Sequence, residues 1–153
     1  MNKSDVAQLL LKYWHGQNLC LNAGISPETV AAFEAQNDIE LPREMSNFLL
    51  SANGFAHDDL QEFKNLDENG FCFLSLNANN LISPAYMVFC KWPYGLLRYA
   101  VYVRPGDKNG EVVLLINESK ACLLAGSFSE FVRLYLADSP KLYSGTSVFK
   151  SII

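Results

Sequence analysis

One short stretch combines an imidazole with carboxylates, the side chains that bind metals and transfer protons. In AHDDLQE, residues 56–62, His57 is followed by Asp58, Asp59 and Glu62. Helical metal motifs place ligands at i and i+4 so that both point from one face, whereas contiguous side chains converge poorly on one ion. The spacing therefore favours a hydrated acidic loop over a metal or acid–base site, and we expect neither a metal nor a cofactor in this protein.

Other patterns of catalytic residues are missing from the sequence. Nucleophilic catalysis needs Ser or Cys beside a base, but the chain has no GxSxG motif and only His15 and His57 as imidazole bases. The glycines of PGDKNG lack phosphate-binding spacing and precede a strand-like run instead of a helix. We therefore expect a protein without enzymatic activity, and turnover that depends on His57 would overturn this expectation.

Acidic residues are concentrated in the first half of the chain. Residues 1–68 hold 4 Lys/Arg against 11 Asp/Glu, and five of these carboxylates lie within eleven residues: Asp58, Asp59, Glu62, Asp67 and Glu68. Nucleic-acid binding relies on clustered Lys and Arg, so this charge balance disfavours a nucleic-acid partner. We interpret residues 56–69 as a long acidic surface loop that could steer the approach of a basic protein.

Aromatic and basic residues form a second group of candidates for partner binding. Trp92 and Tyr94 lie between two strand-like runs, where large amphipathic rings are typical interface anchors, although Trp92 could instead cap the edge of the core. Arg98 and Tyr102 share one face of a predicted strand because side chains alternate. They could contact an acidic partner, or they could lie under the acidic loop and pair with its carboxylates.

Helical signals dominate the first third of the chain. The apolar spacing predicts a helix over residues 5–14. Ser26 and Pro27 predict the start of a second helix, because serine caps a helix and proline fits its first turn. In LPREMSNFLLSANGF, Pro42 starts a third helix, and we expect Gly54 to close it in the left-handed conformation.

Strand signals fill the middle of the chain, and a last helix follows them. The strand-like runs, rich in β-branched and aromatic residues, are FCFLSL, AYMVFCK, RYAVYVR, EVVLLIN and ACLLA. Turn residues between the last three favour hairpins and antiparallel neighbours. Ser127 and Glu130 then form a capping box. We predict an α+β fold, with amino-terminal helices, a central mostly antiparallel sheet of about five or six strands, and a carboxyl-terminal helix packed on the sheet.

Size and apolar patterning favour one cytoplasmic domain over residues 1–153. The longest apolar run, Ala85 to Cys90, has six residues, far below the roughly 20 that cross a bilayer, so we expect no membrane partner. The amino terminus lacks the long apolar stretch of a signal peptide. The four cysteines form no CxxC pair, and we expect all of them to be reduced thiols.

The order of these signals resembles that of a known family. A helix carrying Phe33-Glu34 leads to Leu41-Pro42, then to a helix with Phe48-Leu49-Leu50 and to Asn53-Gly54, and GSFSEFVRLYL follows near the carboxyl terminus. This order is similar to that of the SUKH superfamily, which includes bacterial toxin-immunity proteins and fungal regulators of cell-wall assembly.

The resemblance implies a binding function instead of chemistry, because the shared residues are core and capping positions. It implies a bacterial binding protein that neutralises a cognate toxin domain by direct contact. The alternative is a regulatory or scaffold module that acts on cell-envelope or signalling partners. Neither alternative indicates an oligomeric state.

Overall fold

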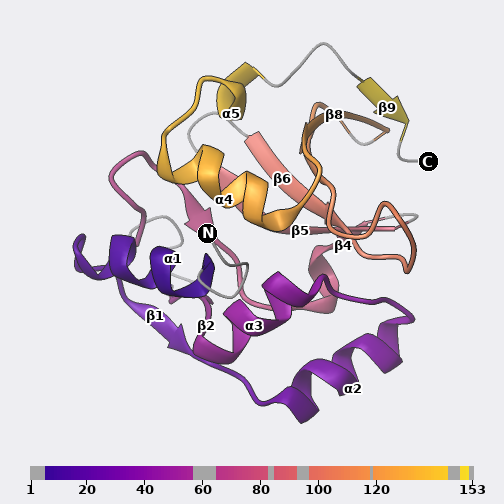
Figure 1. The fold of residues 1–153 in the computed structure, drawn as a ribbon, viewed down its shortest axis with the longest axis horizontal. Coiled ribbons are helices and arrows are strands. Elements are labelled where there is room, and N and C mark those ends of the chain that lie inside the picture. Colours follow the sequence, from indigo (N-terminus) through magenta and orange to yellow (C-terminus); the bar gives the residue numbers. More distant parts are fainter. Residues whose placement is uncertain are drawn as a thin grey trace.

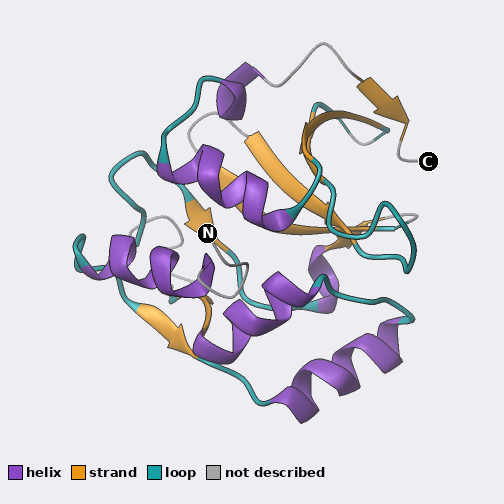
Figure 2. Ribbon diagram, in the orientation of Figure 1, coloured by secondary structure: helices purple, strands orange, loops and turns teal. Residues whose placement is uncertain are grey.

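A computed structural model describes residues 6–56, 65–82, 85–92, 97–117, 119–144 and 149–151. Helices α1 (Val6–His15), α3 (Arg43–Ser51) and α4 (Phe128–Leu136) lie together over one face of an antiparallel sheet, and α2 (Pro27–Asn37) lies at the outer edge of the molecule (Figure 1). Most of the strands follow one another between α3 and α4, and Figure 2 shows helices and strands in separate colours. The α+β fold predicted from the sequence is confirmed.

The predicted helices form, and two of their caps act as expected. The helices are α1 (Val6–His15), α2 (Pro27–Asn37), α3 (Arg43–Ser51), α4 (Phe128–Leu136) and the short α5 (Lys141–Ser144). The Ser26 hydroxyl accepts a hydrogen bond from the Thr29 backbone N–H at 3.1 Å. At the start of α4, the Ser127 hydroxyl accepts from the Glu130 N–H at 3.1 Å, while the Glu130 carboxylate accepts from the Gly126 N–H at 3.0 Å.

The prediction that Gly54 closes the third helix is wrong. Helix α3 ends at Ser51, and residues Ala52–Phe55 form strand β2, which pairs antiparallel with β1 (Leu21–Ala23). Gly54 does have a positive φ, of 76°. A Cβ at this position would lie 2.6 Å from the carbonyl carbon of Leu74. Glycine is therefore needed because two backbone segments cross closely, not because a helix ends there.

The main sheet has seven strands among the described residues. Its continuous order is β3-β5-β6-β7-β8-β9, and β4 pairs with β5. The strands are β3 (Cys72–Phe73), β4 (Leu81–Ile82), β5 (Tyr86–Trp92), β6 (Leu97–Tyr102), β7 (Val112–Leu115), β8 (Lys120–Ala125) and β9 (Phe149–Ser151). Every pairing is antiparallel, as the hairpin signals predicted.

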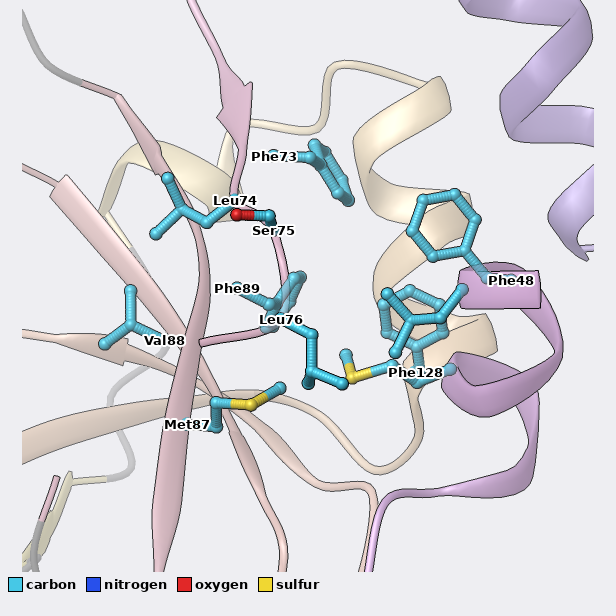
Figure 3. Close-up of a pocket in the computed structure, with 11 residues that line it drawn as sticks. Phe48, Phe73, Leu74, Ser75, Leu76, Met87, Val88, Phe89 and Phe128 are labelled. Atoms are coloured by element: carbon cyan, nitrogen blue, oxygen red, sulfur yellow. The ribbon is translucent and has the colours of Figure 1, made fainter. Parts of the chain in front are cut away.

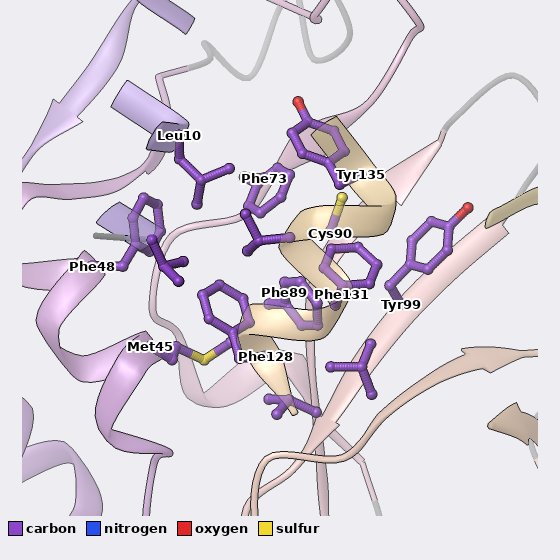
Figure 4. Packing of buried hydrophobic residues seen from close by; sticks show 14 of the residues in the cluster. Leu10, Met45, Phe48, Phe73, Phe89, Cys90, Tyr99, Phe128, Phe131 and Tyr135 are labelled. Atoms are coloured by element: carbon purple, nitrogen blue, oxygen red, sulfur yellow. The ribbon is translucent and has the colours of Figure 1, made fainter. Parts of the chain in front are cut away.

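An aromatic core fills the space between the helices and the sheet (Figure 4). Trp14 is fully buried at its centre, with ring centroids 4.9 Å from both Phe55 and Phe73. Edge-to-face packing of this kind adds to the stabilisation from burial, which is about 1.5–3 kcal/mol for a large apolar side chain. The core thus joins α1, the two-stranded β1–β2 sheet and β3.

The cysteines agree with the predicted reduced state. Cys72, Cys90 and Cys122 are buried, Cys20 is exposed, and none of them forms a disulfide. Within the described ranges, no helix combines the length and apolar character that crossing a membrane requires.

Candidate protein-binding site

Asp67 is the member of the predicted acidic surface that the structure places inside the protein. It is 5% exposed, and its Oδ1 accepts hydrogen bonds from the backbone N–H groups of Asn69 and Phe71, both at 2.9 Å. The Tyr135 hydroxyl donates to its Oδ2 and accepts from Trp14 Nε1 at 2.9 Å. The surface prediction is therefore wrong for Asp67, because this carboxylate closes the turn before β3 and satisfies buried donors.

Burial also changes the ionisation of Asp67. Loss of hydration raises the pKa of its carboxyl group above the usual 3.8, although the hydrogen bonds from Tyr135 and from two backbone N–H groups act in the opposite direction. Two buried hydrogen bonds join Trp14 to Tyr135 and Tyr135 to Asp67. They link α1 and α4 to the turn that carries the next residue, Glu68.

Glu68 is exposed and held against α1. Its Oε1 accepts a hydrogen bond from the Tyr13 hydroxyl at 2.8 Å, and its backbone N–H donates to Gln17 Oε1 at 2.7 Å. Burial, and then the carboxylate of Glu68, raise the pKa of Tyr13 to about 12, so the phenol stays a neutral donor at physiological pH. The hydrogen bond from Tyr13 on α1 therefore orients this surface carboxylate, while Gln17, just after α1, holds the backbone of Glu68.

Trp92 adjoins the same turn from the end of β5. Its Nε1 donates to the backbone carbonyl of Asn69 at 2.6 Å, and the half-buried ring packs against the main core. The ring also lies edge-on to Tyr143, with centroids 6.1 Å apart. Of the two alternatives for Trp92, the structure therefore supports a cap on the edge of the core, and the exposed part of the ring remains part of the surface.

Tyr143 extends this surface with a second carboxylate. The Tyr143 side chain is 38% exposed, and its hydroxyl donates to Asp138 Oδ1 at 2.5 Å. Tyr13, Glu68, Trp92, Asp138 and Tyr143 thus form a connected surface, which we name the acidic–aromatic patch. In this patch each carboxylate is oriented by one tyrosine hydroxyl.

The structure separates Arg98 and Tyr102 from this patch. Tyr99 and Val101 on the same strand point into the main core, whereas Tyr102 packs with Tyr86 on the opposite face of the sheet, with ring centroids 5.3 Å apart. Alternation along β6 places Arg98 on that opposite face as well. The predicted strand faces are confirmed, and the predicted site residues divide between two faces of the sheet.

Four predicted partner-binding residues, Asp58, Asp59, Glu62 and Tyr94, lie outside the described residues, as does His57. The described residues on either side of the acidic stretch are held together. The Asn65 side-chain Nδ2 donates to the carbonyls of Ala56 at 2.6 Å and Cys20 at 2.5 Å. The chain therefore leaves and re-enters the described fold at one place beside β1.

A narrow apolar crevice lies between α3, residues 74–76 and β5 (Figure 3). Its cavity volume is about 20 Å³. A cavity of this size holds about one water molecule, so the crevice has no room for a substrate or cofactor. Within the ranges that the structure describes, no three His, Cys, Asp or Glu residues are grouped so that they could hold a metal ion.

Sequence reasoning missed three members of the patch. Tyr13 lies in the helix predicted over residues 5–14, where apolar spacing indicates burial, while Asp138 and Tyr143 carry no sequence signal for binding. Tyr13 and Tyr143 lie 130 positions apart, and only the packing of α4 and its carboxyl-terminal extension against the turn at Asp67 brings them together.

Comparison with protein families identifies the group to which this fold belongs. A model of the SMI1/KNR4 family (SUKH-1) matches residues 24–134, well over half of the chain. The chain belongs to this family. The predicted SUKH resemblance is thereby confirmed, and SUKH proteins include toxin-immunity proteins. A search of curated proteins found no match to the chain. Glu68 and Trp92 lie inside the region matched to SUKH-1, whereas Tyr13, Asp138 and Tyr143 lie outside it.

Proposed function

We propose that this SUKH-1 protein is a cytoplasmic, non-enzymatic binding protein of bacteria that neutralises a cognate toxin domain by direct contact. The observation that carries the proposal is the SUKH-1 match over residues 24–134, because this family includes toxin-immunity proteins.

The acidic–aromatic patch is the surface that we assign to the toxin. Partly exposed aromatic rings are frequent anchors of protein interfaces, and charges at the rim steer association. Hydrogen bonds from Tyr13 to Glu68 and from Tyr143 to Asp138 hold both carboxylates before a partner arrives. This preorganisation lowers the entropy lost on binding.

The partner proposed for this patch is a basic toxin domain, such as one whose own substrate is a nucleic acid. Carboxylates of the inhibitor would then compete for the Lys and Arg side chains that contact phosphate. Asp58, Asp59 and Glu62 are proposed to contribute to the same acidic surface. Arg98 and Tyr102 lie on the opposite face of the sheet, and we propose them only for a second contact with a partner, apart from the acidic–aromatic patch.

Affinity capture followed by calorimetry tests the proposal. The tagged protein is used to capture partners from a lysate of its source, and the best toxin candidate is titrated as a purified domain. A tight one-to-one complex that abolishes toxin activity supports neutralisation. A purified toxin domain from the same source that neither binds nor loses activity contradicts it.

A charge reversal tests the assigned surface. Glu68→Lys should slow association at least about tenfold at low salt and flatten its salt dependence, because a steering charge becomes repulsive. Glu28→Lys is the matched control, since Glu28 is an exposed carboxylate on the outer helix α2. Equal effects of the two substitutions would remove the patch from the interface.

A regulatory or scaffold role is the second candidate. The matched model describes the SMI1/KNR4 group, and the resemblance found in the sequence also covers regulators of cell-wall assembly. Reproducible capture of cell-envelope or signalling proteins, without any toxin, would favour this role over neutralisation.

A further inference from the structure

A cleft opens at the opposite end of β5 from the acidic–aromatic patch. It lies between the carboxyl-terminal end of α2, strand β4 and the adjoining ends of β5 and β6, and its cavity volume is about 220 Å³. Tyr86 lines the cleft and Trp92 belongs to the patch, so the seven residues of β5 separate the two sites by about 20 Å. The cleft is therefore distinct from the proposed toxin surface.

The volume of the cleft limits the size of its ligand. The cleft has a cavity volume of about 220 Å³. An apolar cavity of about 150 Å³ accepts benzene, whereas pockets for drug-sized molecules begin near 300 Å³. The cleft therefore has room for one aromatic ring and a few further atoms.

The lining of the cleft combines an apolar floor with hydrogen-bonding groups. Ile39, Ile82 and Val103 provide apolar contacts. Tyr86 is 5% exposed, and its hydroxyl forms no hydrogen bond with any described residue. Asn37 donates through Nδ2 to the Phe33 carbonyl at 2.8 Å, and its Oδ1 receives no hydrogen bond from the described part of the chain. A ligand hydroxyl could thus donate to the Asn37 amide oxygen and exchange a hydrogen bond with the Tyr86 hydroxyl.

The charges around the cleft disfavour an ionic ligand. Asn37 is the last residue of α2, so the negative end of the helix dipole lies at this rim, followed by the Asp38 carboxylate. The helix end disfavours an anion. The Arg104 guanidinium lies 3.5 Å from Asp38 Oδ2, so the opposite charges of this exposed pair largely offset each other. A neutral ligand therefore needs no counter-charge from this rim.

We infer that the cleft binds a neutral group of the size of a phenol, with its ring against Ile39, Ile82 and Val103 and its hydroxyl hydrogen-bonded to Tyr86 and Asn37. Such a group occurs in small phenolic molecules and in the tyrosine side chain of a protein partner. This inference does not depend on toxin neutralisation, because the cleft lies apart from the acidic–aromatic patch.

Titration with p-cresol, followed by amide chemical shifts in NMR spectra of the full chain, tests the inference. We expect saturable shifts at cleft residues with a dissociation constant in the millimolar range, as for a ligand of this size. Toluene, which lacks the hydroxyl, and benzoate, which is an anion, should each bind about three- to tenfold more weakly. No saturable shift at the cleft, or tighter binding of toluene than of p-cresol, would overturn the inference.

Two substitutions connect the binding to the lining residues. Tyr86→Phe should weaken p-cresol about three- to tenfold and leave toluene unchanged, because only one hydrogen-bonding group is lost. Ile39→Trp should fill the cleft and abolish binding of both probes. Leu50→Trp is its control, because Leu50 is an exposed leucine outside the cleft. Tyr86→Phe is nearly isosteric, so the test remains decisive even if Ile39→Trp does not fold.

A second probe identifies the source of the phenol group. Binding of N-acetyltyrosinamide at the cleft would support the tyrosine of a protein partner, whereas binding of p-cresol alone would support a free small molecule. Loss of toxin binding in Glu68→Lys with unchanged p-cresol binding would show that the two sites are independent. Failure of both probes overturns the cleft assignment without affecting the neutralisation hypothesis.

Discussion

Removal of one buried hydroxyl should destabilise the protein strongly. In Tyr135→Phe the ring remains, but Trp14 Nε1 loses its acceptor and Asp67 Oδ2 loses its donor. Trp14 is fully buried and Asp67 is 5% exposed, so water cannot readily replace the hydroxyl. Each orphaned buried group costs about 1–3 kcal/mol, and more when it is charged, which gives a loss of about 4 kcal/mol in the free energy of unfolding.

This loss is measurable by denaturant unfolding followed by circular dichroism. In a chain of this length, about 4 kcal/mol lowers the melting temperature by roughly 8–16 °C. The loss should be smaller at acid pH, where Asp67 is protonated and the unsatisfied group is neutral. This pH dependence separates an orphaned carboxylate from a general packing defect.

Tyr143→Phe is the matched control for this experiment. It also removes a tyrosine hydroxyl bonded to an aspartate, but Tyr143 is 38% exposed and Asp138 is exposed, so water can replace the lost partner. We expect a cost of about 1 kcal/mol or less. If both substitutions cost the same, the reasoning about the buried hydrogen bonds is refuted.

Three further results are expected. Gly54→Ala should cost about 3 kcal/mol by thermal unfolding, because its φ is positive and its Cβ would meet the Leu74 backbone at 2.6 Å; Gly106→Ala, with positive φ but nothing within 4 Å, should cost only about 1 kcal/mol. Burial raises the pKa of Asp67 above 3.8, so the stabilisation present below pH 3.8 is lost as the pH rises through the folded pKa. Asp67→Asn should remove this dependence from unfolding curves measured between pH 4 and pH 8. If the difference in unfolding free energy between wild type and variant is the same at every pH, the prediction is contradicted. Alkylation of the native protein should modify Cys20 alone, and all four cysteines after unfolding, as counted by mass spectrometry.

Helix starts were predictable because their signals act over a few residues. A serine cap at Ser26 or Ser127 bonds to a backbone N–H three positions later, so sequence alone contains both partners. Strands β1, β2 and β4 were missed because they span only two to four residues and exist through pairing with distant segments. The role of Gly54 could not be predicted from the sequence, because a glycine suits a helix end and a close crossing of two backbone segments equally well.

The candidate site was predictable only in part. Glu68 and Trp92 were identified from charge and ring type, and the structure brings them to the same turn through the carbonyl of Asn69. Asp67 belonged to the same acidic run but is buried, because Tyr135 supplies a hydrogen bond from 68 positions away. Composition cannot distinguish these neighbouring carboxylates.

The sequence by itself determined the α+β class, the helix caps, the alternating strand faces and the family, because each depends on short-range periodicity or on an ordered set of motifs. Tertiary structure alone decided which acidic residue is buried, which aromatic rings share a surface and where the phenol-sized cleft opens. These features depend on contacts between residues far apart in the chain, and the free energy of each contact exists only after α1, α4 and the sheet have packed together.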